Sequence, residues 1–407
     1  MSELSYLEKL LDGAEVEWLP LGVLGELVRG NGLPKTDFTE AGIPAIHYGQ
    51  IYTFYGLSTE TTKSFVSQDT AKKLKKVNTG DVVITNTSEN LDDVGKALVY
   101  LGKEQAVTGG HATIFKPREG IIGKYFAYFT QTNSFYNEKR KYSKGTKVID
   151  VSASDMAKII IPIPCPNNPE KSLAIQLEIV RILDKFTALT AELTAELTAE
   201  LNMRKKQYNY YRDQLLSFDE DEVEWKMLGE LGENLDSKRK PITSGLREAG
   251  SIPYYGASGI VDYVKDYIFD GDFLLISEDG ANLLARNTPI AFSISGKSWV
   301  NNHAHVIKFD SYAERRYVEY YLNSIDLAPY ISGAAQPKLN KKNLESIRIP
   351  NPSPEDKERI VSILDKFDAL TNSINEGLPR EIELRQKQYE YYRDLLFSFP
   401  RPETASN

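Results

Sequence analysis

The sequence of 407 residues contains one cysteine and four histidines. The single thiol, Cys165, cannot form an internal disulfide, and so few thiols and imidazoles cannot build an array of zinc fingers or ribbons. No stretch approaches 18 uncharged apolar residues, and glutamates lie near the start, where a signal peptide has basic and apolar residues. We therefore expect a cytoplasmic protein without a role in a membrane.

The chain also has no excess of basic residues, because its formal net charge is -8. Affinity for phosphate comes mostly from lysine and arginine, so this total taken alone argues against a nucleic-acid binder. The hydrophobic content of 41% excludes general disorder. The sequence has no P-loop pattern of glycines and lysine, which excludes ATP hydrolysis by that route. At about 150 residues per domain, the length predicts two or three domains.

What the chain does contain is an internal repeat. Short segments of the first half recur in the same order in the second half, and their separation falls from 207 residues near the start to 181 near the end. One duplication followed by loop deletions in the second copy leaves this pattern. The paired segments are 16–18 with 223–225, 47–49 with 254–256, 80–81 with 271–272, 110–112 with 302–304, 145 with 333, 161–162 with 349–350, 182–186 with 363–367 and 204–213 with 385–394.

Each copy predicts a strand-rich domain, a proline-rich hinge and one long helix. The first helix is expected over about residues 173–216, a length of about 65 Å. Residues 6–11 resemble 211–216, so the chain opens with the tail of a repeat, which favours a circular arrangement. The predicted fold class is α+β, with two similar strand-rich domains separated by two long antiparallel helices in pseudo-two-fold symmetry. The predicted segments are an N-terminal framework at 1–28, a strand-rich domain at 29–165, a central long helix at 166–222, a second strand-rich domain at 223–350 and a C-terminal long helix at 351–407.

The central helix contains three tandem copies of Thr-Ala-Glu-Leu at residues 190–201. Four residues turn by about 400° on a helix, so the leucines form a stripe that drifts by about 40° per copy. An ordinary coiled coil explains the leucines alone, whereas the identical residues between them favour a spacer of adjustable length. Gly377 and Pro379 predict an interruption of the C-terminal helix opposite this run. The predicted spacer residues are Thr190, Leu193, Thr194, Leu197, Thr198 and Leu201.

These features resemble the specificity subunits of type I restriction-modification enzymes, in particular the branch with Thr-Ala-Glu-Leu spacer repeats. The resemblance covers essentially the whole chain, on the duplicated segments and the tetrapeptide run given above. It implies two target recognition domains, each of which recognises one half of an asymmetric bipartite site in double-stranded DNA, and helices that fix the spacer length. It implies a chain with no catalysis or cofactor of its own. Two modification (methyltransferase) subunits would bind S-adenosylmethionine and methylate adenine, and restriction subunits would use ATP and magnesium to translocate and cut DNA.

The distribution of charge fits this resemblance better than its total does. Residues 29–158 have 18 basic and 13 acidic side chains, a net charge of +5, and residues 232–348 have 14 of each, which leaves -13 to the framework. We therefore expect the isolated chain to bind DNA weakly. A single lysine cluster is more often solvated surface, but recurrence at matched places favours phosphate contacts. The predicted contacts are Lys72, Lys73, Lys75, Lys76, Lys139, Arg140, Lys141, Lys144, Lys147, Lys238, Arg239, Lys240, Lys338, Lys341 and Lys342.

Base recognition needs amides, hydroxyls and similar groups on turns that reach the major groove. Matched polar stretches at 85–90 and 277–282, and at 48–50 and 255–258, supply such groups and differ between the copies. Ordinary turn polarity looks the same, so both interpretations stay open. The predicted base-recognition residues are Gln50, Asn86, Thr87, Ser88, Asn90, Ser258, Glu278, Asn282 and Gln336.

His111 and His303 occupy matched places and are expected to be satisfied strand histidines, and we expect no metal site. The main alternative function is a self-contained metal-dependent nuclease, for which Asp272, Glu278 and Asp279 would be the carboxylates. A protein-interaction adaptor that does not recognise duplex DNA is a third hypothesis.

Two matched groups on the long helices are predicted to dock the two modification subunits. The alternative is that their tyrosines only pack the helix pair together. The groups are Tyr208, Tyr211 and Arg212, and Tyr389, Tyr392 and Arg393.

Overall fold

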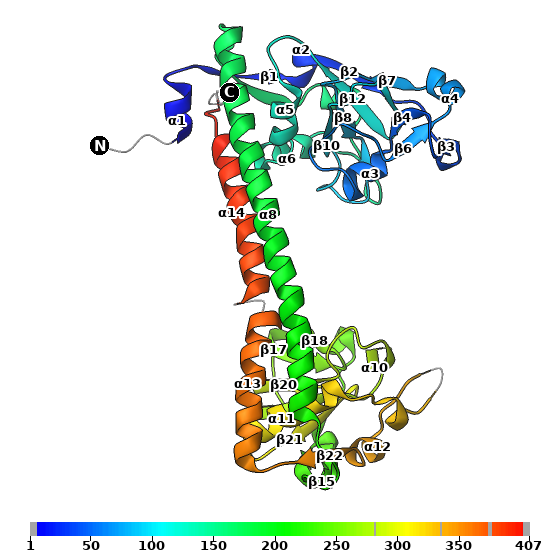
Figure 1. Cartoon of the computed structure of the whole chain (residues 1–407), viewed down its shortest axis with the longest axis vertical. Coiled ribbons are helices and arrows are strands. Elements are labelled where there is room, and N and C mark those ends of the chain that lie inside the picture. Colours follow the sequence, from blue (N-terminus) through cyan, green and yellow to red (C-terminus); the bar gives the residue numbers. More distant parts are fainter. Residues whose placement is uncertain (1–5, 281, 334–335, 373–376, 402–407) are drawn as a thin grey trace. The chain divides into compact units, whose positions relative to one another are not determined.

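The computed structural model describes residues 6–280, 282–333, 336–372 and 377–401, and the chain divides into two compact units. The first unit comprises Met1–Ala195 and Glu383–Asn407, and the second comprises Glu196–Ile382. Each unit combines a strand-rich domain with parts of the long helices (Figure 1), which confirms the α+β class. Within the described ranges, no helix has the length and apolar character needed to cross a membrane.

The first unit is built on two five-stranded sheets. The first sheet has the order β2 (Gly25–Arg29), β12 (Ala112–Pro117), β8 (Val82–Thr85), β10 (Ala97–Tyr100) and β5 (Ser58–Thr59). The second has the order β3 (Phe38–Thr39), β6 (Ser64–Val66), β4 (Ile43–Ile46), β11 (Ala106–Thr108) and β7 (Lys75–Val77). Two short pairs are β1 (Val16–Pro20) with β14 (Ile160–Pro164), and β9 (Thr87–Ser88) with β13 (Ile149–Asp150).

The second unit has one six-stranded sheet. Its order is β16 (Glu233–Asn234), β21 (Ala304–Lys308), β19 (Phe269–Ser277), β20 (Ala291–Val300), β17 (Ala249–Gly256) and β18 (Gly259–Val264). A short pair joins β15 (Glu224–Met227) to β22 (Arg348–Asn351), as β1 joins β14 in the first unit.

The central strands of the two units pair in the same register. In β8, Ile84 lies opposite Thr113 of β12, and in β19, Ile276 lies opposite His305 of β21. Both pairs are 192 residues apart in the sequence, as the repeat predicts. Strands β8 and β10 are buried along their whole lengths, because helices and a second sheet cover their faces.

Each unit also contains short helices and 3-10 turns. In the first unit they are α1 (Tyr6–Leu11), α2 (Leu21–Leu24), α3 (Tyr48–Thr53), α4 (Gln68–Lys73), α5 (Gly123–Phe129), α6 (Asn133–Arg140), α7 (Ala153–Met156) and the 3-10 turn η1 (Lys35–Asp37). In the second unit they are α9 (Leu228–Leu231), α10 (Asn282–Ala285), α11 (Tyr312–Ser324), α12 (Lys341–Glu345) and the 3-10 turns η2 (Asp236–Lys238), η3 (Ser244–Leu246) and η4 (Ala328–Tyr330).

Helix α8 (Pro169–Leu216) is a single helix of 48 residues that begins one turn earlier than expected, at a proline, which fits the first turn of a helix. The expected single C-terminal helix is wrong in one respect, because it forms two helices of 19 residues each, α13 (Pro354–Asn372) and α14 (Leu378–Leu396). Gly377, with φ of +80°, precedes α14, and Pro379 lies in its first turn, so the predicted interruption is confirmed.

Matched aromatic pairs join these helices inside each unit. The rings of Phe186 on α8 and Tyr392 on α14 are stacked with centroids 5.6 Å apart in the first unit. In the second unit the rings of Phe367 on α13 and Tyr211 on α8 are stacked at 5.8 Å. Each residue of the first pair lies 181 positions from its equivalent in the second. Helix packing therefore repeats with the sequence.

Both ends of the described chain belong to the first unit. Trp18 donates a hydrogen bond from Nε1 to the Pro400 carbonyl, at 2.9 Å, and the Arg401 guanidinium lies 4.6 Å from the Trp18 ring centre. Leu11 and Phe397 are buried in the same core. Since Trp18 is the equivalent of Trp225, the two terminal segments together replace the continuous connection that the second unit has between α8 and β15.

Candidate nucleic-acid interface

The two units build the same main-chain arrangement where a central strand ends and a polar turn begins. After β8, the Asn86 amide donates to the His111 carbonyl at 2.9 Å. After β19, the Glu278 amide donates to the His303 carbonyl, also at 2.9 Å. In both units, therefore, the turn after the central strand is hydrogen-bonded to the turn before the adjacent strand, which is β12 in the first unit and β21 in the second.

A third segment attaches to this arrangement in each unit. The Val151 amide donates to the Asn86 carbonyl at 2.9 Å, and the Leu339 amide donates to the Glu278 carbonyl at 2.7 Å. Each of these residues follows a bridged pair that closes a loop, Lys144 with Asp150 in the first unit and Ser332 with Lys338 in the second. We call the strand-end turn, the histidine turn and this loop together the polar platform.

The two loops close in the same way. Lys144 and Asp150 exchange two main-chain hydrogen bonds, and so do Ser332 and Lys338. The second residue of each loop is a glycine with positive φ, +102° at Gly145 and +87° at Gly333. A side chain at either glycine would meet the carbonyl oxygen three residues later, so both loops require glycine.

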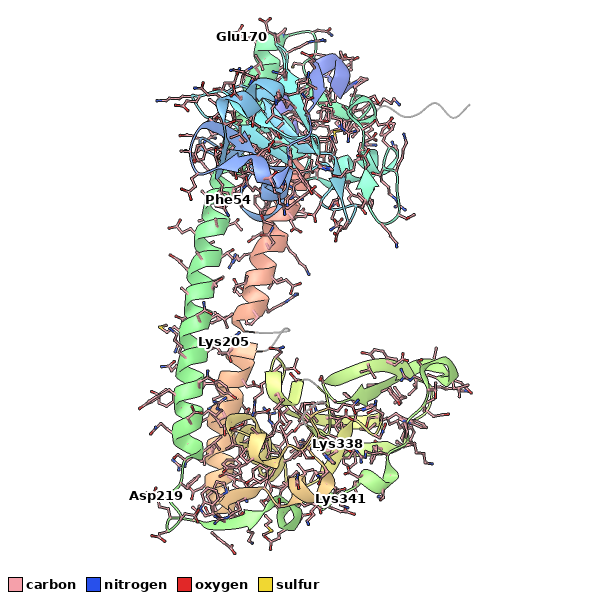
Figure 2. All side chains as sticks on the ribbon, turned by 90° about the vertical axis from the view of Figure 1, so that its right-hand side faces the viewer. Phe54, Glu170, Lys205, Asp219, Lys338 and Lys341 are labelled. Carbon is pink, nitrogen blue, oxygen red and sulfur yellow. The ribbon has the colours of Figure 1, made fainter. Side chains whose placement is uncertain are left out.

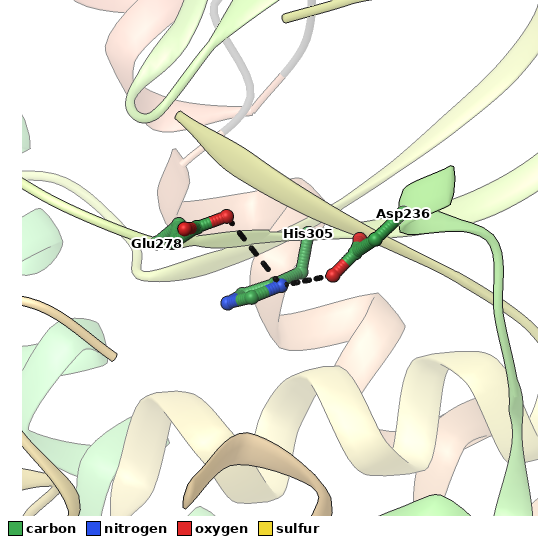
Figure 3. Close-up of side chains that lie close together, drawn as sticks. All are labelled: Asp236, Glu278 and His305. Carbon is green, nitrogen blue, oxygen red and sulfur yellow. Dashed lines mark hydrogen bonds and ion pairs between the residues drawn. The ribbon is translucent and has the colours of Figure 1, made fainter. Parts of the chain in front are cut away.

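In the second unit, a network of polar and charged side chains lies beneath the platform. The His305 ring, 1% exposed, lies between two oxygens: Nδ1 is 2.6 Å from the Asp236 carboxylate, and Nε2 donates to the Leu339 carbonyl at 2.6 Å. Figure 3 shows the ring between the carboxylates of Asp236 and Glu278. Glu278 accepts from Arg239 at 2.6 Å and pairs with Lys338 at 3.0 Å. The network therefore links β19, β21, η2 and the loop.

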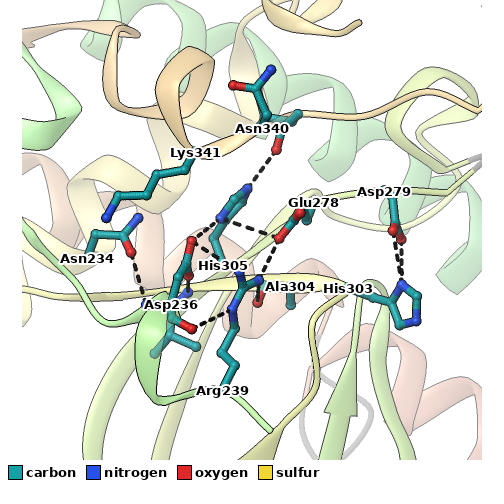
Figure 4. Close-up of polar contacts among 12 residues, drawn as sticks. Asn234, Asp236, Arg239, Glu278, Asp279, His303, Ala304, His305, Asn340 and Lys341 are labelled. Atoms are coloured by element: carbon teal, nitrogen blue, oxygen red, sulfur yellow. Dashed lines mark hydrogen bonds and ion pairs between the residues drawn. The ribbon is translucent and has the colours of Figure 1, made fainter. Parts of the chain in front are cut away.

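The carboxylates of Asp236 and Glu278 both face nitrogen groups of His305 and Arg239 in this network (Figure 4). Burial acts to raise the pKa of the Asp236 carboxyl, but the hydrogen bond and charge of His305 hold that pKa below its ordinary value. Burial likewise opposes ionisation of Glu278, and its hydrogen bonds with Arg239 and Lys338 lower the pKa overall. Both carboxylates are thus held in their charged forms.

Three side chains of this network are of the types that bind metal ions. Asp236, Glu278 and His305 offer ligand atoms within 4.8 Å of one another. However, both nitrogens of the His305 ring are already engaged, and Glu278 is bound by two cationic side chains. A divalent cation here would be placed against Arg239 and Lys338, so the arrangement fits an ion-pair network and does not fit a cation site.

In the first unit the equivalent positions are neutral. Asn86, which is 0% exposed, replaces Glu278, and its Oδ1 accepts from Thr113 Oγ1 at 2.8 Å. Thr113 in turn replaces His305. Because its side chain is fully buried, Asn86 cannot touch a base edge, and its predicted role in base recognition is replaced by a structural one. The side chains of Glu278 and Arg239 are mostly buried, 11% and 13% exposed, and they pair with each other at 2.6 Å.

The exposed part of each platform is a histidine pair. In the first unit the His111 ring lies 3.1 Å, by Nδ1, from the Thr87 hydroxyl. In the second unit His303 Nδ1 lies 2.9 Å from the Asp279 carboxylate. The side chains of His303 and Asp279 are 50% and 32% exposed. Asp279 lies in the polar stretch predicted at 277–282 but is not among the residues predicted from it. The recurrence of His111 and His303 at a separation of 192 residues was the available signal for the two histidines.

The predicted phosphate contacts of the first unit fall into two groups. Lys72, Lys73 and Lys75 are exposed on α4 and β7, and Lys147 and Arg140 are also exposed. The others are engaged or buried. Lys139 is 4% exposed, its amine donates to the carbonyls of Asp92 and Val94, and burial lowers its pKa to about 8, so its predicted DNA contact is wrong. Engaged side chains are Lys76 with the Ala71 carbonyl, Lys141 with Glu138, and Lys144 with Asp155.

In the second unit, exposed lysines lie close to the platform. Lys338 belongs to the loop itself, and Lys341 and Lys342 are on α12 directly after it; Figure 2 labels Lys338 and Lys341. Lys238 and Lys240 are exposed at η2. Lys338 pairs with Glu278, and Lys341 lies 3.6 Å from Glu345.

Three of the other predicted base-recognition residues donate hydrogen bonds within their own domain. Gln50 donates to Ser64, Asn90 donates to Asp93, and Asn282 donates to the Thr288 carbonyl. Thr87 and Ser88 are half-buried at the platform, and Ser258 and Gln336 are exposed. Of the predicted set, the structure therefore brings Thr87, Ser88 and Gln336 to the platform surface.

The predicted docking residues lie partly inside the helix pair. Tyr208 packs against Phe367, and the Tyr389 hydroxyl lies 3.1 Å from Thr187 Oγ1. Arg212 and Arg393 stack over these tyrosines at 5.7 and 5.9 Å. Beside them, Tyr210 and Tyr391 are 62% and 64% exposed. The exposed surface of each group therefore centres on the neighbouring tyrosine.

Among the spacer residues, Leu193, Leu197 and Leu201 are half-buried, as are Thr190 and Thr194, and Thr198 is exposed. None of them belongs to the buried cores identified in the described part of the chain.

The chain is similar to proteins of one family. Residues 15–203 and 220–384 match the family model described as type I restriction modification DNA specificity domain. The chain is 41% identical over 434 residues to the specificity subunit of the type I restriction enzyme EcoR124I/EcoR124II of Escherichia coli, with 100% of both chains covered. It is 39% identical over 394 residues to the specificity subunit of EcoprrI of Escherichia coli, with 92% and 93% covered.

Among solved structures, a chain from a structure of the type I restriction-modification system has the same fold. Its TM-score is 0.63 at 15% identity, and the alignment covers 94% of this chain and 97% of that one.

Proposed function

The chain belongs to the type I restriction-modification DNA specificity family, and we propose that each of its two units recognises one half of a bipartite, asymmetric DNA site. It is a specificity subunit, which selects DNA and leaves catalysis to other subunits. The observation that supports the finer proposal is the polar platform, which has the same main-chain bonds in both units and different side chains.

This combination suits a protein that recognises two different half-sites. The main chain holds a turn and a loop in a fixed position, while the side chains decide which donors and acceptors are offered to base edges. Exposed lysines beside each platform, such as Lys73 and Lys75 in the first unit and Lys341 and Lys342 in the second, supply contacts to phosphates without sequence preference.

The self-contained metal-dependent nuclease is not supported. Its candidate carboxylates are already paired: Asp272 lies 3.2 Å from Arg315, Glu278 is bound by Arg239 and Lys338, and Asp279 by His303. Both relatives described above are specificity subunits.

The helices are proposed to set the distance between the half-sites, and the chain is assigned to the branch with spacer repeats. Helix α8 is continuous through the Thr-Ala-Glu-Leu copies at 190–201, so each copy adds about 6 Å and about 40° of rotation. A step of one base pair in B-DNA turns by about 35°. Rotation therefore favours a change of about one base pair for each copy.

We propose two equivalent docking surfaces for modification subunits, one around Tyr210 and Tyr211 and one around Tyr391 and Tyr392. They are matched by the repeat, and exposed tyrosines are enriched in protein interfaces. The modification subunits would bring S-adenosylmethionine, and restriction subunits would bring ATP and magnesium.

The docking proposal is tested by the variants Tyr210→Ala and Tyr391→Ala, each co-purified with the modification subunit. Each single variant is expected to lower the bound ratio from two modification subunits to one, and the double variant to abolish binding. Tyr312→Ala, an exposed tyrosine on α11, is the control. Full binding by the double variant would assign these tyrosines to the helix surface alone.

The proposed function is tested by mapping methylated adenines in cells that contain this chain with its partner subunits. A single asymmetric site in two parts, absent from cells without the chain, is expected. Methylation that does not depend on the chain, or a continuous site, would contradict the proposal.

A further inference from the structure

We propose that the exposed histidine pairs are the base-recognition groups: Thr87 with His111 in the first unit, and Asp279 with His303 in the second. In the second unit we assign Asp279 to the exocyclic amino group of a cytosine in the major groove. This inference rests on the proposed function and names the side chains that make the half-sites different.

The first argument is position. Thr87 and Asp279 each follow the residue that ties the end of the central strand to the histidine turn. Each also faces the loop: Asp150 pairs with Thr87 in β13 and β9, and Lys338 forms the equivalent bridge with Asp279. The two pairs therefore occupy one structural position in the two units, at the exposed end of the same frame.

The second argument is chemical difference on an unchanged frame. At this position the first unit has a hydroxyl and the second has a carboxylate. A threonine offers a donor, an acceptor and a methyl group, which suits contact with the methyl group of thymine. A carboxylate only accepts, and the base edge that satisfies it in the major groove is the N4 amino group of cytosine.

The third argument is that the carboxylate has no structural duty that would explain it. Asp279 and His303 form a polar pair whose side chains are 32% and 50% exposed, and pairs at the surface contribute little to stability. A carboxylate on the segment that is bridged to Lys338 also repels phosphates, which opposes binding unless the carboxylate contacts a base. The buried network beneath supplies the structural role separately, through His305, Asp236 and Glu278.

The second ring nitrogen of His303 completes the pair. Nδ1 faces Asp279, which fixes the ring orientation, and in Figure 4 the other nitrogen points away from the carboxylate. In the first unit the His111 ring is held by Thr87 and packs against Tyr48, with ring centres 4.8 Å apart. Both histidines thus present one nitrogen from a fixed ring.

The test uses the complete complex with partner subunits and the variant Asp279→Asn, followed by mapping of methylated adenines. Asparagine keeps the size but offers an amide, so one position of the half-site recognised by the second unit should lose its preference for cytosine by about tenfold to hundredfold. The other half-site and the gap should be unchanged. Thr87→Val should change one position in the other half-site only.

Asp270→Asn is the matched control, because Asp270 is an exposed aspartate at the opposite end of the same strand, β19. His303→Gln is measured in parallel, and the assembled complexes are purified to verify folding. An unchanged half-site in an assembled Asp279→Asn complex, with the bipartite site of the wild type established, would overturn this inference and leave the proposed function standing. Failure of both Asp279→Asn and His303→Gln to assemble would also overturn the inference, because Asp279 and His303 would then be needed for folding.

Discussion

The two units place the same main-chain frame over different interiors. Beneath the platform of the first unit, Asn86 and Thr113 share a neutral hydrogen bond. At the same positions in the second unit, Glu278 and His305 belong to a buried network with Asp236, Arg239 and Lys338. The same main-chain frame therefore forms over two different sets of buried polar side chains, one neutral and one charged.

The two recognition domains also differ in net charge and in how many of their cationic side chains are free to contact phosphates. The first domain, residues 29–158, has a net charge of +5, and the second, residues 232–348, is neutral. In the second unit Arg239 and Lys338 neutralise the carboxylate of Glu278, so these cations contribute little field to DNA. Phosphate contacts therefore depend on fewer exposed lysines in the second unit.

The largest expected difference concerns stability. Glu278→Ala removes the carboxylate that pairs with both Arg239 and Lys338 and should destabilise the second unit by about 3–5 kcal/mol. Asn86→Ala removes one neutral acceptor from Thr113 and should cost about 1–3 kcal/mol in the first unit. Hydrogen exchange of β19 and β21, compared with β8 and β12 in the same molecule, measures both. Equal losses of protection would show that the two interiors are energetically alike.

A smaller effect is expected on DNA affinity. Lys73→Ala with Lys75→Ala should lower the magnitude of the slope of log affinity against log salt by about 2 and leave the half-sites unchanged. Lys341→Ala with Lys342→Ala makes the matched change in the second unit. Binding of duplex DNA to the complete complex is measured over a range of salt. A change of half-site sequence would show that these lysines contact bases.

The smallest expected effect concerns the gap between the half-sites, and it should leave the sequences recognised by both domains unchanged. Deletion of residues 198–201 removes one Thr-Ala-Glu-Leu copy and should shorten the gap between half-sites by about one base pair, because it removes about 40° of helix rotation. Methylation mapping gives the gap directly. An unchanged gap, or a changed half-site, would contradict the separation of helices from recognition domains.

Much of the architecture follows from the repeat. The repeat predicted the two strand-rich domains. Apolar periodicity predicted the long central helix, and Gly377 with Pro379 predicted the interruption, because these are local signals. The matched loops at Gly145 and Gly333 were also visible, since only glycine tolerates their backbone.

The site was less predictable. Polarity cannot distinguish Asn86, which is buried, from Thr87, which faces the surface one residue later. Similarly, the sequence does not distinguish Lys139 from a surface lysine, but its position on α6 directs the amine to the carbonyls of Asp92 and Val94. The partners of His305 come from η2 and from the residue after the loop, and such distant contacts leave no local pattern.

The central claim is that the two units recognise their half-sites independently, and exchange of one domain tests it most directly. Residues 29–158 are replaced by the equivalent segment of another family member, and methylated adenines are mapped in cells with the partner subunits. The account predicts that one half-site changes completely while the other half-site stays the same. A change in both half-sites, with an assembled and active complex, would contradict it.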